Sequence, residues 1–552
     1  MLSAGELDFD RASGSSTPPL SGFPSLNLFD ADFTAIQEEI RNIDWNNAWE
    51  NSNLEDFPKL LHDSTFEICK KHAPLKKQSQ GKKPKDHHLK TLLRKLKRLK
   101  FRLKCIETLS PSSPRSEVIR KEILALKDVI KCHSYKTSEK NERRAIAKIK
   151  SKPKHFYQYV KKQSKVKKRI TQLYNQDGDL HTEKEVLANI LQRQFVSSFS
   201  NPLNPDKVIP SLPSRTINTL SDFSINYENI IGAIDEIDIN SSCPGYSIPA
   251  PVLKNCKHEL AEPLLIMWKH SLLVGKIPSF YKKQLVTPIY KKGSRAHPIN
   301  YRPISLTAHE IKIFERIVRD RLITHLDLNN LLSHLQHGFR KGKSCLTQLL
   351  KHYDNILANL LSDKETDTIF LDFAKAFDKV DHQILLQKVK SFGITGKLYN
   401  WIADFLTDRE QVVALDGIMS FVAAVISGVP QGTVLGPILF LIFINDINDC
   451  VKHSSLSCFA DDTRVSKAIT TENDMLLLQK DIDNLLQWAK SNNMEMHDDK
   501  FVFINFNLRS RNFYLPLLPF YDECFKYSTS DANILETSTE VKDLGILHLP
   551  LT

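Results

Sequence analysis

The sequence lacks the features of membrane-spanning and secreted proteins. No run of about 18 apolar residues occurs, so no membrane-spanning helix is predicted. The most apolar window, PILFLIFINDI at residues 437–447, is shorter than that and ends in polar residues. The N-terminal stretch MLSAGELDFDRASGSSTPPLSG has no basic start followed by an apolar run, so it does not resemble a secretory signal. We therefore expect an intracellular protein without a membrane partner.

Cysteine is scarce and scattered. The chain has nine cysteines among 552 residues, and none forms a Cys-x-x-Cys pair. This spacing supports neither a zinc module nor a disulfide scaffold, and a reducing compartment is the simplest setting. No internal repeat of 20–50 residues is present either, which argues against a solenoid or propeller.

Positive charge is concentrated in one segment. The net charge is +12, but residues 70–169 contain 34 Lys+Arg and 7 Asp+Glu, a local net charge of +27. The rest of the chain therefore sums to −15. Such asymmetry favours a polyanionic partner, most often nucleic acid.

Within the basic segment, LKTLLRKLKRLKFRLKCIETL places leucines at helical spacing and Lys or Arg on the other faces. Further on, KPKHFYQYVKKQSKVKKR interleaves aromatic residues with lysines, a pattern that supplies phosphate contacts and stacking surfaces. The candidate nucleic-acid-binding residues are Arg94, Lys95, Lys97, Arg98, Lys154, Phe156, Tyr157 and Tyr159. The alternatives are a solvated charged face around a local hydrophobic seam, or a helix of the membrane-surface or calmodulin-binding type.

Composition divides the chain. Residues 1–30 are rich in Ser, Pro and Gly and are predicted to be disordered, and residues 31–170 are predicted to be helical and strongly basic. From residue 171 onward the pattern is that of a globular α+β protein, with helical and strand-like segments mixed.

Carboxylates mark the candidate site. Residues 368–373 are apolar and β-favouring, and Asp372 lies near the end of this predicted buried strand, where an ionised side chain needs a partner or a bound cation. The stretch SCFADDTRV predicts a hairpin with Asp461 and Asp462 at its tip. Converging carboxylates of this kind hold paired Mg²⁺ ions for phosphoryl transfer, although a surface position or a glycosidase pair would also account for two acids. A second pair, Asp498–Asp499, lies in a polar segment and is interpreted as surface charge.

The motifs occur in a recognisable order. FLDFAKAFDKVDH, GVPQGTVLGPILFLIFINDI and FADD follow LLSHLQHGFRKGKSCLTQL along the chain. This series resembles the reverse transcriptase of non-LTR (LINE-type) retrotransposons, from about Lys154 to Ile546. The resemblance implies a right-hand polymerase, with a fingers-like region at 171–365 and a palm with the catalytic hairpin at 366–552.

The resemblance also implies roles for single residues. Asp372, Asp461 and Asp462 match the metal-binding aspartates, for two Mg²⁺ or Mn²⁺ ions, and Lys500 falls near the lysine that donates a proton to pyrophosphate. Phe377 matches the residue that excludes a 2′-hydroxyl, with core packing as its alternative role. Further nucleotide-binding matches are Gln431, Gly432, Arg302 and Arg340, and each of the two arginines could instead form a structural ion pair. His337 and His382 are expected to be structural.

The implied function is RNA-directed DNA synthesis. The protein would extend a DNA or RNA primer with dNTPs on an RNA template, in the nucleus or in a cytoplasmic ribonucleoprotein, and no protein partner is indicated. Residues 1–150 contain no endonuclease series, and the chain ends shortly after VKDLGI, so we expect a truncated copy without endonuclease and thumb. The alternative is an inactive nucleic-acid-binding remnant. Phe377 disfavours an RNA-dependent RNA polymerase.

Overall fold

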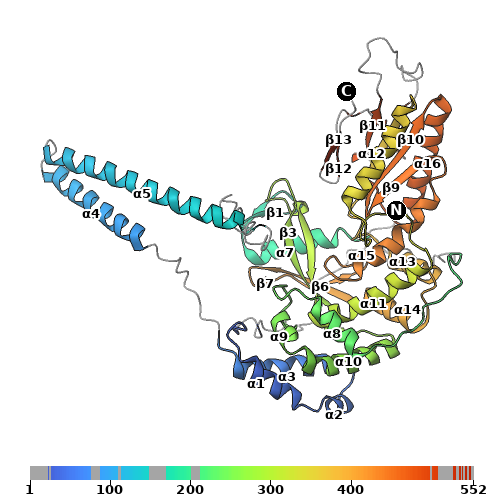
Figure 1. Cartoon of the computed structure of the whole chain (residues 1–552), viewed down its shortest axis with the longest axis horizontal. Coiled ribbons are helices and arrows are strands. Elements are labelled where there is room, and N and C mark those ends of the chain that lie inside the picture. Colours follow the sequence, from blue (N-terminus) through green and yellow to red (C-terminus); the bar gives the residue numbers. More distant parts are fainter. Residues whose placement is uncertain are drawn as a thin grey trace, which may run out of the picture. The chain divides into compact units, whose positions relative to one another are not determined.

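A four-stranded antiparallel sheet organises the C-terminal half of the computed structural model (Figure 1). Its strand order is β11 (Val502–Phe506), β5 (Glu365–Leu371), β10 (Asp462–Ile469) and β9 (Ser455–Phe459). All seven residues of β5 are buried, as the β-favouring run predicts. The structure describes residues 23, 26–75, 87–109, 114–147, 149, 169–200, 212–497, 500–507, 526–529, 534–535, 538, 541–543 and 546–548.

Helices cover both faces of this sheet. On one face Phe370 packs with Ile356 and Leu360 of α12 (Cys345–Leu361). On the other face Ile369 and Leu371 join the main core, to which α16 (Glu472–Ser491) contributes its buried side chains. The alternation along β5 therefore places one apolar layer on each side. Helix α15 (Gly436–Ile444), buried at every position except Pro437, continues the main core and is followed by the 3₁₀ segment η4 (Asn445–Asp449).

A second sheet has the order β4 (Tyr301–Leu306), β3 (Lys283–Tyr290), β6 (Arg409–Leu415) and β7 (Ile418–Met419), with β8 (Ala423–Val425) also paired to β6. Helix α7 (Lys184–Val196) lies against β6, and its Gln192 Nε2 donates to the Gln411 carbonyl at 2.9 Å. Two small hairpins, β1 (Leu173–Tyr174) with β2 (Leu180–His181) and β12 (Val541–Asp543) with β13 (Ile546–His548), complete the strands of the described residues.

A layer of helices packs around α10 (Lys257–Val274) and shares the main core. Its members are α8 (Tyr227–Asp235), α9 (Ala250–Asn255), α11 (His309–Leu328) and α14 (Gly396–Leu406), and α13 (His382–Ser391) packs on α14 and α15. The 3₁₀ turn η2 (Ser279–Tyr281) precedes β3, and η3 (Pro298–Asn300) lies between β3 and β4. Trp268 of α10 stacks on Phe314 of α11 at a centroid distance of 5.0 Å, and Trp401 of α14 meets the same ring edge-on at 4.9 Å.

The N-terminal helices α1 (Phe33–Arg41), α2 (Trp45–Glu50) and α3 (Phe57–His72) also pack on this layer. Arg41 bonds Glu259 at 2.6 Å, and Leu26 is buried in the same core. The division of the chain therefore differs from the sequence-based one. Residues 1–75 and 171–552 form one compact unit, and residues 76–170 form another. Most of the predicted disordered tail, residues 1–30, lies outside the described residues.

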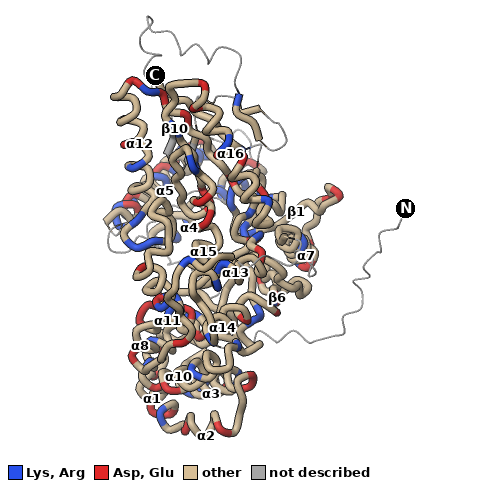
Figure 2. The backbone as a smooth tube through the Cα atoms, turned by 90° about the vertical axis from the view of Figure 1, so that its right-hand side faces the viewer, with Lys and Arg blue, Asp and Glu red and all other residues tan. Residues whose placement is uncertain are grey.

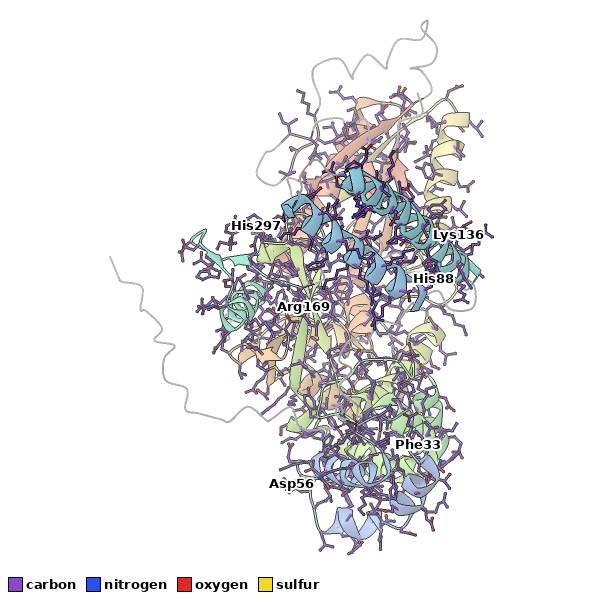
Figure 3. All side chains as sticks on the ribbon, turned by 90° about the vertical axis from the view of Figure 1, so that its left-hand side faces the viewer. Phe33, Asp56, His88, Lys136, Arg169 and His297 are labelled. Carbon is purple, nitrogen blue, oxygen red and sulfur yellow. The ribbon has the colours of Figure 1, made fainter. Side chains whose placement is uncertain are left out.

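The second unit contains a helical hairpin of α4 (His87–Leu109) and α5 (Pro114–Ala147). Its seam is the predicted leucine pattern: Leu99 is buried against Ile123 and Leu126 of α5, with Leu92, Leu96 and Leu103 beside them. Both helices carry many Lys and Arg residues. Figure 2 marks the basic and acidic positions along the backbone of the described chain. Figure 3 shows the side chains of this unit, with His88 on α4 and Lys136 on α5 labelled. Across the described chain, no helix combines the length and the apolar character that crossing a bilayer requires.

Candidate active site

The β9–β10 hairpin turns where the sequence predicts it. Phe459 pairs with Asp462, so Ala460 and Asp461 form a two-residue loop, and Ala460 adopts a left-handed conformation with φ of 57°. This conformation is unfavourable for alanine and needs support from its surroundings. The support comes from Gln336, whose Oε1 accepts hydrogen bonds from Ala460 N at 2.9 Å and from Gly338 N at 2.8 Å. A Cβ on Gly338 would lie 2.4 Å from Ala460 N, so only glycine permits this close approach.

Strand pairing brings the three predicted aspartates together. Leu371 of β5 pairs with Thr463 of β10, so Asp372 follows β5 at the point where Asp462 opens β10. Burial raises the pKa of Asp461, and the nearby charge of Asp372 raises it further, whereas Arg302 and Lys291 lower it. Asp372 and Asp461 are therefore near enough for their charges to repel each other. Carboxylates that bind a shared cation are expected to be this close.

Three cations surround these carboxylates. Lys500 Nζ lies 2.7 Å from Asp372 Oδ2. Burial lowers the pKa of Lys291, as do Arg302, Lys292 and Lys500, while Asp372 raises it. Lys500 and Arg302 were predicted from the sequence, and Lys291 was missed. The signal available for Lys291 was its basic pair directly after an apolar strand, in IYKKGSR.

The donor set can be compared with the needs of a metal ion. Among the described residues, no group of three or more His, Cys, Asp or Glu side chains is arranged to hold one. Mg²⁺, however, usually takes one or two protein carboxylates and completes its shell with water and substrate phosphates. Two mutually repelling carboxylates, Asp372 and Asp461, beside the exposed Asp462 fit that demand.

The glycine-rich loop after β8 is held between two other segments. Gly428 N donates to Val380 O at 2.7 Å and Val429 N to Phe377 O at 2.8 Å, and a Cβ on Gly428 would be 2.8 Å from Asp378 O. On the other side Ser305 N donates to Gln431 O at 2.8 Å. The loop is thus fixed on both flanks.

Two of the predicted nucleotide-binding residues lie in this loop. Gln431 Nε2 donates to Asp378 Oδ1 at 2.8 Å, which leaves its own side-chain oxygen as an acceptor. Gly432 has φ of 111°, and a Cβ there would meet Ser305 O at 2.4 Å. Glycine at position 432 therefore permits a close approach to strand β4 of the protein itself.

Phe377 is half-buried and held by two rings. It stacks on Phe440 of α15 at a centroid distance of 4.3 Å and an interplanar angle of 15°, and Phe339 meets it edge-on at 6.0 Å. Packing fixes the ring in place, and the ring is only partly covered.

Arg340 makes structural contacts, the alternative weighed for it. Its guanidinium donates to Ser333 O at 2.9 Å and Leu332 O at 3.2 Å and lies 3.4 Å from Asp327. The two histidines are structural as well, since His382 Nε2 bonds Gly428 O at 2.8 Å and His337 Nδ1 bonds Thr347 Oγ1 at 3.0 Å.

Some predicted residues lie elsewhere. Arg94, Lys95, Lys97 and Arg98 are exposed on α4, in the second unit. The candidates Lys154, Phe156, Tyr157 and Tyr159 and the comparison pair Asp498–Asp499 lie outside the described residues.

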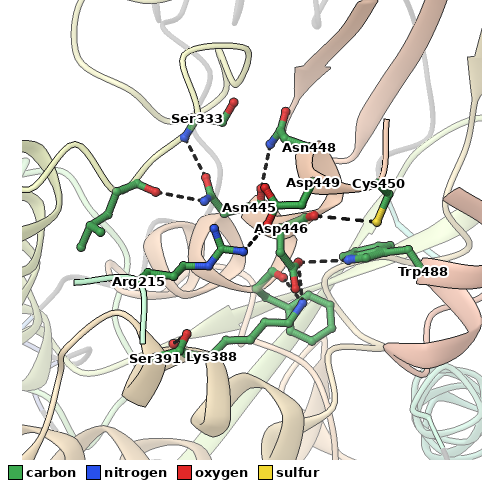
Figure 4. Close-up of polar contacts among 12 residues, drawn as sticks. Arg215, Ser333, Lys388, Ser391, Asn445, Asp446, Asn448, Asp449, Cys450 and Trp488 are labelled. Carbon is green, nitrogen blue, oxygen red and sulfur yellow. Dashed lines mark hydrogen bonds and ion pairs between the residues drawn. The ribbon is translucent and has the colours of Figure 1, made fainter. Parts of the chain in front are cut away.

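Sequence reasoning missed the supports of the site. Gln336, Gly338 and Asp378 lie within the recognised motifs but were not singled out. It also missed an ion pair with a buried lysine, where Lys388 Nζ lies 2.7 Å from Asp446 Oδ1 and 2.6 Å from Phe443 O (Figure 4). Trp488 Nε1 donates to the same Asp446 oxygen at 3.0 Å. The pair thereby joins α13, η4 and α16.

Comparisons with known proteins agree with the motif series. Residues 289–547 match the family described as "Reverse transcriptase (RNA-dependent DNA polymerase)". The chain is 30% identical over 340 residues to the "RNA-directed DNA polymerase from mobile element jockey" of Drosophila melanogaster, which covers 59% of this chain and 37% of that protein. It is 28% identical over 336 residues to the "Probable RNA-directed DNA polymerase from transposon BS" of the same organism, covering 58% and 37%.

The aligned region thus spans little more than a third of these relatives. Among solved structures, an apo telomerase from Candida tropicalis truncated from its C-terminal domain is similar with a TM-score of 0.31 and 13% identity, over 41% of this chain and 50% of that one. Residues 289–547, which contain the hairpin, the strand-end aspartate and the glycine-rich loop, are therefore similar to the reverse transcriptase family and to RNA-directed DNA polymerases of mobile elements.

Proposed function

We propose that the protein is an RNA-directed DNA polymerase that extends a primer 3′-hydroxyl with dNTPs on an RNA template. The observation that carries the proposal is the convergence of Asp372 and Asp461 from β5 and the β9–β10 hairpin, within a domain of the reverse transcriptase family. In this proposal residues 171–365 serve as fingers and residues 366–552 as palm. The primer would be DNA or RNA.

The carboxylates supply the reaction centre. Reverse transcriptases use divalent metal ions, and Asp372, Asp461 and Asp462 would hold them here. Two bound Mg²⁺ (or Mn²⁺) ions would activate the attacking hydroxyl and stabilise the departing pyrophosphate. Lys500, in contact with Asp372, holds a proton at Nζ that it can give to pyrophosphate. Arg302 and Lys291 add positive charge beside Asp461, where triphosphate oxygens would bind.

Selection of the nucleotide would involve the fixed loop and the packed ring. Phe377, held by Phe440 and Phe339, would exclude a sugar 2′-hydroxyl by contact. The side-chain oxygen of Gln431 would accept from the nucleotide, because Asp378 binds its Nε2. Arg340 would bind the triphosphate only if its guanidinium released the carbonyls of Leu332 and Ser333.

The basic hairpin would contact the nucleic-acid backbone. Arg94, Lys95, Lys97 and Arg98 are exposed on α4, so their charges are available to phosphates. Aromatic and basic residues at 154–159 would extend this contact.

Primer extension on an RNA template tests the polymerase proposal. The purified chain with Mg²⁺ and dNTPs is expected to extend a primer, and Asp461→Asn and Asp462→Asn to reduce extension at least a hundredfold. Asp498→Asn, which changes the comparison pair, is the matched control and should retain activity. Equal extension by all variants would contradict the assignment. Template binding without extension by the unaltered chain would instead indicate the inactive remnant.

A further inference from the structure

The outer face of α4 combines dense positive charge with one large exposed ring. The hairpin seam uses Leu92, Leu96, Leu99 and Leu103, and at 100° per residue Phe101 points away from that seam. Its side chain is 69% exposed. Five exposed cations share this side of the helix, and we call the set the Phe101 face: Lys90, Arg94, Lys97, Arg98, Phe101 and Lys104.

The cations lie directly around the ring. Lys97 and Arg98 precede Phe101 by four and three residues and Lys104 follows it by three, so all three are its neighbours on the helix surface. Among the described residues, no carboxylate lies within ion-pair distance of the five cations of the Phe101 face. The charge is therefore not balanced locally, and the ring is not covered by the seam.

The two helices differ in this respect. Helix α4 has eight Lys or Arg and one acidic residue, Glu107, whereas α5 has nine Lys or Arg and five acidic residues. A polyanion would therefore be attracted chiefly to α4.

We propose that the Phe101 face binds single-stranded nucleic acid, with an unpaired base stacked on Phe101 and the strand's phosphates on the surrounding cations. The inference rests on the proposed contact of this hairpin with nucleic acid and names the form of strand that it takes. Aromatic side chains in a basic groove bind single strands because every unpaired base offers a ring face. A duplex keeps its bases paired and stacked, so it would leave Phe101 without a partner.

A lipid surface fits the same face less well. Interfacial helices need a continuous apolar surface. The other strongly exposed apolar side chain among the described residues of α4 is Leu93, eight residues from Phe101 and therefore about 12 Å along the axis. The two do not form one apolar surface.

Equilibrium binding of the full-length chain to a fluorescent single-stranded RNA tests the inference. The RNA carries a blocked 3′ end, and dNTPs and Mg²⁺ are omitted, so polymerase activity does not enter. Phe101→Ala is expected to weaken binding about 5- to 100-fold without changing the dependence of affinity on salt. Phe101→Leu should resemble Phe101→Ala, because it keeps apolar bulk and loses the ring. Lys97→Ala should instead reduce the salt slope by about 0.7.

Tyr135→Ala is the matched control. Tyr135 is 72% exposed on α5, but its helical neighbours are one cation, Lys131, and one acid, Glu139. This variant should bind RNA as the unaltered chain does. If it loses as much affinity as Phe101→Ala, exposed aromatic surface in general is responsible, and the assignment to the Phe101 face is overturned.

An abasic strand of the same length separates stacking from charge. It keeps the phosphates, so the unaltered chain and Phe101→Ala should bind it equally, and Lys97→Ala should still lower the salt slope.

An equally large effect of Phe101→Ala on binding of the abasic strand or of a duplex would overturn the proposed base stacking. If neither Lys97→Ala nor Phe101→Ala changes binding, the contact of the hairpin with nucleic acid fails as well, whatever the primer-extension result. Binding to phosphatidylserine vesicles that Phe101→Leu preserves, with RNA binding unchanged by Phe101→Ala, would replace the inference with a membrane role.

Discussion

Asp378 supports the candidate active site through its contact with Gln431, although it was not singled out from the sequence. Its carboxylate accepts from Gln431 Nε2, and its backbone carbonyl accepts from Ser427 Oγ at 2.8 Å. Burial raises the pKa of Asp378 from 3.8 to about 6, although the Gln431 bond and Lys375 oppose the shift. The folded protein therefore bears a cost when this group ionises.

Replacing Asp378 with Asn should change how stability depends on pH. Between about pH 4 and pH 6 the unfolded chain has lost this proton and the folded chain has kept it, so the free energy of unfolding of the natural chain falls as pH rises through that window. Asp378→Asn removes the titration and still accepts from Gln431. Its stability relative to the natural chain is expected to increase by up to about 3 kcal/mol from pH 4 to pH 7. Urea unfolding at both pH values measures this, and a constant difference would contradict it.

The contact between Gly338 and Ala460 permits a second residue-level test. Gly338→Ala would press a Cβ against the backbone of the hairpin tip, and we expect a loss of about 2 kcal/mol or more in stability. Gly245→Ala is the control, because nothing lies within 4 Å of a Cβ at that position. Thermal unfolding compares the two variants. Similar melting temperatures would show that the tip is not held by this close contact.

Between elements, the Lys388–Asp446 pair is the clearest buried connection. The Lys388 ammonium also lies 4.6 Å from the Phe443 ring centroid and 4.9 Å from that of Trp488. Lys388→Met would leave Asp446 without its cation, at an expected cost of about 3 kcal/mol. The double variant Lys388→Met/Asp446→Leu should lose less than Lys388→Met alone, because no uncompensated charge remains. Additive losses in a double-mutant cycle would contradict this coupling.

Element by element, the sequence predicted what local pattern encodes. The buried run of β5, the hairpin around Asp461 and the leucine seam of α4 each follow from a local pattern. The turn itself is Ala460–Asp461, one residue shorter than predicted, because Asp462 already pairs with Phe459. Gln336 supports Ala460 from 124 residues away, and Arg41 binds Glu259 across 218 residues, so no local pattern contains either contact. The packing of α1–α3 on α10 was missed for the same reason. Lys500 and Asp372, 128 residues apart, were associated only through the family resemblance.

At the scale of the whole molecule, the exposed cations of α4 are separate from the main hydrophobic core. The seam of the hairpin and the main core share no residue, and the exposed cations of α4 belong to neither. Changing Arg94, Lys95, Lys97 and Arg98 to Ala together should therefore lower RNA affinity and reduce the salt slope by about 3, since each phosphate contact on a single strand contributes about 0.7. Calorimetric unfolding of the main unit should remain within about 1 °C of the natural chain. A large shift in that transition would mean that these residues stabilise the main unit.

The ion pair between Lys500 and Asp372 has a consequence for how the protein would respond to divalent cations. The Lys500 ammonium lies 2.7 Å from Asp372 Oδ2, so a divalent cation must displace it in order to bind Asp372. Lys500→Met should thus shift the Mg²⁺ dependence of the melting temperature to lower concentration, while primer extension at saturating Mg²⁺ falls for want of a proton donor. A higher Mg²⁺ affinity together with a lower rate of primer extension would show that Lys500 both competes with cations for Asp372 and takes part in the reaction.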